Sequence, residues 1–219
     1  MKYIENLILV QQQLESAFEN NSEQQLLKIL KENSFLFYEL YDRKFSLEPN
    51  FAEVPFGQEY RCDFAWLNDN SDGPEWVIVE IEKPKVRLFN KNGDPSAELN
   101  HAIEQVKSWK RYFEQYPDRK REIFGCVLRF RFVVVIGTRE DWQEKHAAQW
   151  RAFFNKDEKN IEIRSMDVFW RALNIAKNAS ESERTALSFF MGNPHSRMPS
   201  ELKEYCDTNT YLQSYRNWL

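Results

Sequence analysis

The stretch Trp76-Val77-Ile78-Val79-Glu80-Ile81-Glu82-Lys83-Pro84 places two carboxylates at the end of an apolar run. The run is short, rich in β-branched residues and closed by a proline, so it predicts a strand. Because successive side chains of a strand point to opposite faces, Glu80 and Glu82 share one face, and Val79 and Ile81 share the other. Like charges on one face repel each other. The segment is therefore a candidate cation site as well as part of the core.

A third carboxylate lies in the segment before it. Asp63 belongs to residues 60–66, and residues 68–74 (Asn-Asp-Asn-Ser-Asp-Gly-Pro) are turn formers that would fold the two strands into a hairpin. A hairpin brings Asp63 close to Glu80 and Glu82. Their carboxylates, with the carbonyl of Ile81 between the two glutamates, suit a hard divalent cation. The alternative is that the two glutamates lie on the solvent face of an edge strand and discourage aggregation.

Composition describes an ordinary globular chain. Of its 219 residues, 42% are hydrophobic and 29% charged, and the aromatic share of 15% predicts an aromatic-rich core. Three widely spaced cysteines show no metal-ligand pattern and favour a reducing, cytoplasmic compartment over a disulfide framework. The N-terminal segment resembles neither a signal peptide nor a membrane span, so no membrane association is expected.

Basic residues are concentrated in one part of a chain whose net charge is −4. Residues 107–140 contain nine basic and four acidic side chains, and Lys107, Lys110 and Arg111 open this region. Such a surface favours contact with a phosphate backbone. A solvated charged face is the equally plain alternative.

Hydrophobic periodicity predicts the order of the elements. Two helices come first, the second capped by Ser22 with Gln25 three residues on. An antiparallel meander follows, then a long helix that begins at Asp94-Pro95 and ends near Tyr116. A run at residues 129–137 predicts the central, doubly covered strand, and a helix, a short strand, a helix capped by Ser165 and helical tail segments complete the chain. The meander strands are expected at residues 44–47, 52–55, 59–67 and 75–83. This order predicts an α/β or α+β sandwich.

These elements together resemble the PD-(D/E)xK nuclease superfamily and, more narrowly, the nuclease domain of the Shedu anti-phage defence family. The resemblance covers about residues 33–167. It is carried by Asp63-Phe64, Val79-Glu80-Ile81-Glu82-Lys83-Pro84, the helix with Ala102-Ile103-Glu104-Gln105, the Val135-Ile136-Gly137 strand and a late Ile-x-Ile with a following Asp. It implies a restriction-endonuclease-like core, in which a mixed sheet is flanked by helices, with further helices at both ends.

The resemblance also implies roles for single residues. Asp63 and Glu80 would hold Mg²⁺ or Mn²⁺, and Gln105 would lie near the active site. At position 82 the superfamily usually has lysine and this chain has glutamate, which would bind metal or activate water. Lys83 does not replace that lysine, because one step along a strand reverses the face. Phosphate stabilisation then falls to the metal, Lys85, Arg87 or Arg61.

The sequence thus predicts a Mg²⁺-dependent DNA endonuclease in anti-phage defence, with catalytic residues Asp63, Glu80, Glu82 and Gln105. The alternative is a catalytically silent nuclease-fold module that binds DNA or protein. We expect residues 1–33 to form helices packed on a core of residues 34–178, and residues 179–219 to form a helical tail of the same domain. The resemblance favours a homo-oligomer. With about forty residues before the sheet, no attached N-terminal sensor domain is expected.

Overall fold

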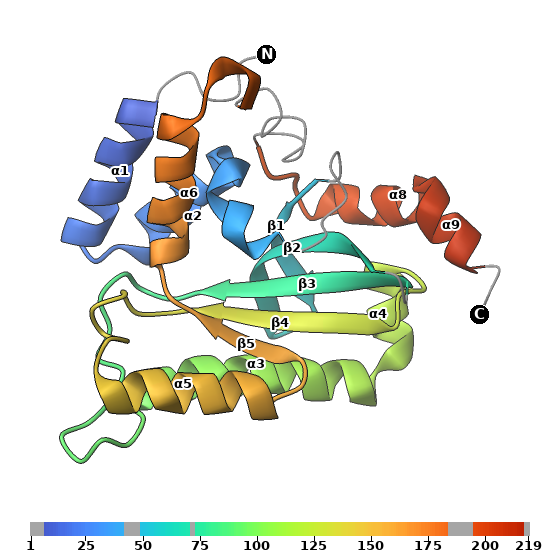
Figure 1. The fold of residues 1–219 in the computed structure, drawn as a ribbon. Coiled ribbons are helices and arrows are strands. Elements are labelled where there is room, and N and C mark those ends of the chain that lie inside the picture. Colours follow the sequence, from blue (N-terminus) through green and yellow to red (C-terminus); the bar gives the residue numbers. More distant parts are fainter. Residues whose placement is uncertain (1–6, 42–48, 71–72, 184–194, 217–219) are drawn as a thin grey trace.

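A mixed five-stranded sheet forms the middle of the molecule in the computed structural model, which describes residues 7–41, 49–70, 73–183 and 195–216 (Figure 1). The strands lie side by side in chain order. The first three pair antiparallel, whereas the last two run parallel to the third. The strands are β1 (Phe51–Phe56), β2 (Tyr60–Asn70), β3 (Gly73–Ile81), β4 (Arg129–Val135) and β5 (Ile161–Arg164).

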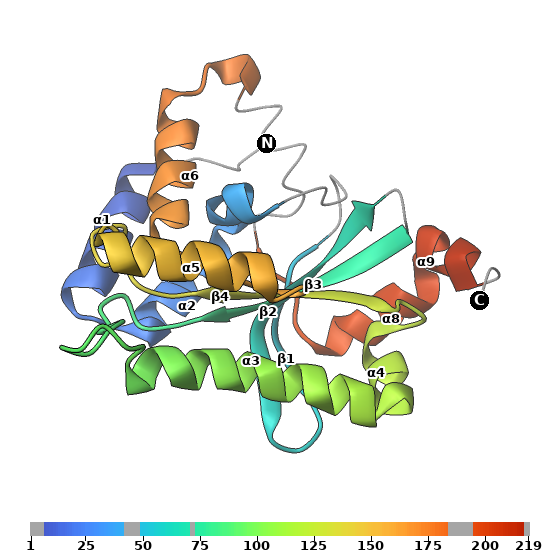
Figure 2. The same ribbon diagram turned by 60° about the horizontal axis from the view of Figure 1, so that its bottom comes forward.

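Helices cover both faces of this sheet and make a three-layer sandwich (Figure 2). One face packs against α3 (Ala97–Gln115), α4 (Pro117–Phe124) and α5 (Lys145–Asp157). The opposite face packs against α1 (Leu7–Glu19), α2 (Glu23–Glu32), the 3-10 helix η1 (Ser34–Leu40) and α6 (Asp167–Asn178). The C-terminal helices α8 (Ser200–Thr208) and α9 (Thr210–Arg216) join the α3 side through Leu202, Tyr205 and Leu212.

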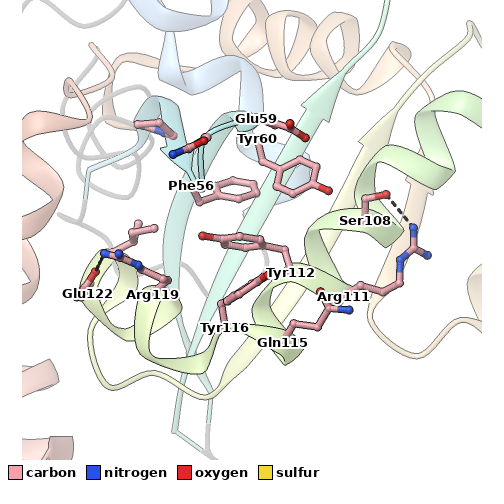
Figure 3. A pocket seen from close by; sticks show the side chains of 14 residues that line it. Phe56, Glu59, Tyr60, Ser108, Arg111, Tyr112, Gln115, Tyr116, Arg119 and Glu122 are labelled. Carbon is pink, nitrogen blue, oxygen red and sulfur yellow. Dashed lines mark hydrogen bonds and ion pairs between the residues drawn. The ribbon is translucent and has the colours of Figure 1, made fainter.

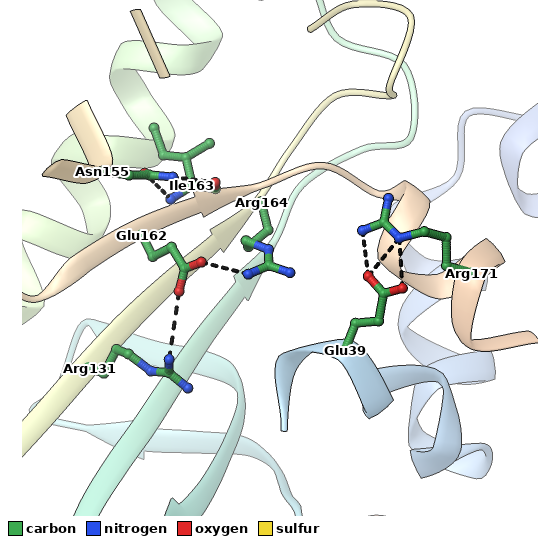
Figure 4. A network of polar contacts seen from close by, with 7 residues as sticks. All are labelled: Glu39, Arg131, Asn155, Glu162, Ile163, Arg164 and Arg171. Carbon is green, nitrogen blue, oxygen red and sulfur yellow. Dashed lines mark hydrogen bonds and ion pairs between the residues drawn. The ribbon is translucent and has the colours of Figure 1, made fainter. Parts of the chain in front are cut away.

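Aromatic side chains fill the two cores, as their abundance predicts. Trp66, Trp76 and Trp109 are fully buried together with a set of phenylalanines. A bidentate ion pair between Arg171 of α6 and Glu39 of η1 joins two elements of the second helix layer (Figure 4). The predicted sandwich of a mixed sheet flanked by helices is confirmed, and so is the antiparallel meander. Among the described residues, no helix combines the length and apolarity needed to cross a bilayer.

Several boundaries differ from the sequence expectation. The central strand is β3, and β4 lies one place nearer the edge. The long helix begins after Ser96, whose hydroxyl accepts from the Leu99 N–H at 3.1 Å, because Asp94 is held in a turn with Asn90. Helix α6 starts at Asp167 without a side-chain cap, so Ser165 is not its N-cap. The expected cap of α2 by Ser22 is confirmed. The strand expected at residues 44–47 lies outside the described residues.

Candidate active site

The β2–β3 hairpin brings the two cleft carboxylates of the sheet together. Phe64 pairs with Val79, and the same register continued by one residue sets Asp63 opposite Glu80. Directly opposite residues of an antiparallel pair project from the same face. The pairing changes character here, because Oδ2 of Asp63 accepts a hydrogen bond from the backbone N–H of Ile81 at 2.7 Å. The Asp63 side chain thus accepts a hydrogen bond from a backbone amide of β3.

A break in the alternation of β2 directs the Asp63 carboxylate. Cys62 and Ala65 both pack on the α3 side of the sheet. They are three residues apart, so regular alternation would place their side chains on opposite faces. The neighbouring strand has the same irregularity, since Glu53, between the pairs Ala52–Phe64 and Val54–Cys62, has a left-handed φ of 52°. Distorted strand backbone of this kind is common beside functional sites, where it re-aims a side chain.

Gln105 of α3 fixes the second carboxylate. Its side-chain amide Nε2 donates to Oε1 of Glu80 at 2.5 Å. The other carboxylate oxygen, Oε2, is buried and has no hydrogen-bond partner among the described residues. A buried carboxylate oxygen without a donor is costly, so a cation at this oxygen would relieve a real deficit. Because β3 is an internal strand, the edge-strand alternative for Glu80 and Glu82 is wrong.

These groups open into a cleft of about 750 Å³ between β2, β3 and α3. Asp63, Glu80 and Gln105 line it together with Glu23, Arg61 and His101. Glu82 follows the last residue of β3, and its backbone N–H donates to the carbonyl of Val135 at 3.0 Å. Its side chain is partly buried beside the cleft and is not among the described lining residues.

The carboxylates raise one another's pKa. Burial is the largest cause of the rise in the pKa of Asp63 to about 7, and the charges of Glu23 and Glu82 add to it against the hydrogen bond from Ile81. Burial, followed by the charge of Asp63, raises the pKa of Glu80 well above its usual range. Burial and then Glu23 also raise the pKa of Glu82. The metal-free cleft therefore disfavours ionisation of these carboxyl groups, and a bound cation would favour their charged forms.

Glu23 is the cleft residue that sequence reasoning missed. It is the first residue of α2, directly after the Ser22 cap, where an acid ordinarily complements the helix dipole. A long-range clamp connects this turn to the end of β3. The side chain of Asn21, which has a left-handed φ of 49°, accepts from the Lys85 N–H at 2.7 Å and donates to the Lys85 carbonyl at 3.1 Å. No local sequence pattern announces this contact.

The basic residues singled out by the sequence lie in different places. Lys107 faces α5, where its Nζ lies 2.6 Å from Glu158 and over the ring of Phe154. Arg111 contacts Glu104 and Ser108 and lines a hollow next to the cleft. Lys110 is partly buried on the same helix and lines neither hollow.

Other cations near the sheet contact groups away from the cleft. Arg131 of β4 lies 3.7 Å from Glu162 of β5, which also pairs with Arg164 (Figure 4). The Arg87 side chain donates to the carbonyl of Phe89. The backbone of Lys85 is held by Asn21, and Lys85 is not a lining residue of the cleft. Of the cations named for phosphate stabilisation, Arg61 is the one that lines the cleft.

The donor set fits a hard cation bound by few protein ligands. In the described part of the chain, no group of three or more His, Cys, Asp or Glu side chains is arranged to hold a metal ion. Mg²⁺ commonly needs less, because it keeps several waters and binds one or two carboxylates together with substrate phosphates. Asp63, with one oxygen free of the Ile81 bond, and the unpartnered oxygen of Glu80 provide such a pair.

The fold comes first. A mixed sheet lies between two helix layers, with paired carboxylates in a cleft beside β2 and β3, and this is the α+β core that the sequence predicts. The chain belongs to the Shedu family, because the family model described as "Shedu protein SduA, C-terminal" matches residues 20–170. A search of the curated proteins gave no match.

Similar solved structures are distant. A complex of EndoMS with double-stranded DNA has 19% identity and a TM-score of 0.33, and the match covers 66% of this chain and 44% of that one. The restriction endonuclease FokI has 15% identity and a TM-score of 0.37, with 79% and 28% covered. FokI bound to DNA has the same identity and TM-score, with 89% and 30% covered. The chain thus spans less than half the length of each of these solved chains.

Proposed function

We propose that this chain is a Mg²⁺-dependent DNA endonuclease that acts in defence against phage. The single observation that carries the proposal is the pair of partly buried carboxylates, Asp63 and Glu80, in one cleft, with a buried Glu80 oxygen that has no partner among the described residues. Membership of the Shedu family supports the defence role. Asp63, Glu80 and the carbonyl of Ile81 would hold the ion, which supplies positive charge for the scissile phosphate.

The chain's own residues would do the rest of the work. Gln105 would keep the Glu80 carboxylate in one orientation through its hydrogen bond to Oε1. Arg61, whose side chain is 64% exposed at the cleft, would leave its ion pair with Glu53 at 3.5 Å and contact a phosphate oxygen. Glu82, whose pKa is raised, would accept the proton of the attacking water or contribute a further ligand.

Cleavage of supercoiled plasmid tests the proposal. We expect wild-type protein to nick or linearise the plasmid in Mg²⁺ and not in EDTA, and Glu80→Gln to be at least about 100-fold slower, the loss expected when a group that stabilises the transition state is removed. Glu59→Gln is the matched control, since Glu59 is an exposed carboxylate of the same cleft. Cleavage at the wild-type rate by Glu80→Gln would refute the assignment.

A catalytically silent DNA-binding module is the second candidate. The observation that favours it is Glu82 at the position where the superfamily usually has lysine. Calorimetry separates the two functions. The nuclease requires Mg²⁺ binding that disappears in Glu80→Gln, whereas a silent module binds DNA equally well with and without the ion and does not cut it.

A further inference from the structure

A second hollow continues the carboxylate cleft along α3 (Figure 3). It has a volume of about 880 Å³ and shares with the cleft the turn between β1 and β2, Tyr60 and Ser108. From Ser108 it runs past Tyr112 to Tyr116 at the end of α3 and to Arg119 on α4. A polymer held at the carboxylates can therefore extend into this groove without leaving the surface.

Three tyrosines form a row along the groove. The ring centroids of Tyr60 and Tyr112 are 5.5 Å apart, and those of Tyr112 and Tyr116 are 5.0 Å apart. Tyr112 and Tyr116 share one side of α3 because they are four residues apart. Gly57 lets the turn approach the row, since a Cβ there would lie 3.0 Å from the Tyr112 ring.

The spacing determines how the row can be used. A flat base inserted between two rings needs about twice the ~3.4 Å stacking distance, which is more than either gap allows. A base therefore stacks on an outward ring face. Tyr116 offers that face, because it is 51% exposed. Figure 3 shows its ring at the open end of the row.

Two guanidinium groups stand beside the row. Arg111 donates to Ser108 Oγ at 2.8 Å, and Arg119 pairs with Glu122 at 2.8 Å. The side chains of both arginines are more than half exposed. Exposed pairs of this kind contribute little stability, so either arginine can exchange its partner for a phosphate oxygen at small cost.

On the basis of the proposed function, we infer that this groove holds unpaired nucleotides adjoining the bond that the cleft cuts. The base nearest the open end stacks on Tyr116, and the backbone passes Arg111 and Arg119. Aromatic grooves also take proline-rich peptides. Continuity with the carboxylate cleft and the two flanking guanidinium groups favour a nucleic acid strand here. The enzyme would then prefer DNA with a single-stranded segment beside the cut.

Fluorescence anisotropy in EDTA tests the inference, with a labelled single-stranded oligonucleotide and a labelled blunt duplex as probes. We expect Tyr116→Ala to weaken single-strand binding about 5-fold or more, within the 5- to 150-fold range of losing one stacked base. Duplex binding should change by less than about 2-fold, and Tyr116→Phe, which keeps the ring, should bind as the wild type does. Tyr38→Ala is the matched control, because Tyr38 is a 39% exposed tyrosine on η1, outside the groove.

Three results would overturn the inference: unchanged single-strand binding by Tyr116→Ala, an equal loss in Tyr38→Ala, or binding of a labelled proline-rich peptide without binding of the oligonucleotide. The nuclease proposal fails by a different result. Binding in EDTA does not require hydrolysis, so a groove that binds single strands can coexist with an inactive cleft. Conversely, loss of plasmid cleavage in Glu80→Gln would stand even if the oligonucleotide did not contact Tyr116.

Discussion

Replacing Asp63 by asparagine should stabilise the metal-free protein while removing its affinity for Mg²⁺. Asparagine has nearly the same size and keeps an oxygen that accepts from the Ile81 N–H, now 2.7 Å from the carboxylate. The substitution removes only the buried charge, which burial and the neighbouring carboxylates of Glu23 and Glu82 oppose. A residue retained for function at the expense of stability behaves in this way.

The pKa of Asp63 gives the sign and the size of this effect. It is about 7 in the folded protein against an ordinary 3.8. Between these values the folded protein keeps a proton that the unfolded chain has released, so Asp63 lowers the free energy of unfolding as pH rises from about 4 to about 7. At 1.36 kcal/mol per pKa unit, the cost at pH 8 reaches roughly 4 kcal/mol at most. We expect Asp63→Asn to recover about 2–4 kcal/mol at pH 8 and almost none near pH 4.

Urea unfolding in EDTA across this pH range measures the difference between variant and wild type. Glu59→Gln removes an exposed carboxylate of the same cleft and should stay within about 0.5 kcal/mol of the wild type at every pH. Saturating Mg²⁺ should then stabilise the wild type and leave Asp63→Asn unchanged. The reasoning is refuted if Asp63→Asn is no more stable than the wild type at pH 8, or if its gain is the same at pH 4 and pH 8.

Three further outcomes follow from the same geometry. Asn21→Gly tolerates the left-handed backbone but loses both hydrogen bonds to Lys85, so urea unfolding should show a loss of about 1–3 kcal/mol; no loss would mean that the clamp contributes nothing. Glu23→Gln removes a charge that raises the pKa of Asp63, so carboxyl NMR titration should find that pKa lower; an unchanged value would place Glu23 outside the cluster. Gly57→Ala adds a Cβ 3.0 Å from Tyr112 at a φ of +70°, so it should cost about 1–2 kcal/mol in thermal unfolding, and a neutral result would mean that the turn relaxes freely.

Local sequence patterns predict much of the architecture. The turn-forming residues 68–74 and the two flanking strands were enough to predict the β2–β3 hairpin. The 3.6-residue period predicts the apolar stripe of α3, although the helix is capped by Ser96 and does not begin at the expected Asp94. Both predictions depend on residues that are close together in the chain. Asp94 does not cap α3, because it is hydrogen-bonded to Asn90 in the preceding turn.

The features of the cleft and the groove that sequence reasoning missed depend on contacts between residues distant in the chain. In the sequence, Glu23 is an ordinary acid in the first turn of a helix. Its place in the cleft becomes visible only when Asn21 contacts Lys85, which is 64 residues away from Asn21. Tyr116 looks like the end of a helix, and its place in an aromatic row becomes visible only when the β1–β2 turn lies beside α3. The break in the side-chain alternation of β2 near Asp63 has no local signal either, because the sequence of the strand appears regular.

The hydrogen bond from Gln105 to Glu80 also has a meaning for synthesis of the protein. The two carboxylates proposed to hold the ion, Asp63 and Glu80, come from β2 and β3, and the amide that orients Glu80 comes 25 residues later, from α3. A nascent chain that has left the ribosome only as far as β3 therefore carries its acids without the group that arranges them. Under the proposed nuclease function, the candidate active site would be complete only after translation has passed α3.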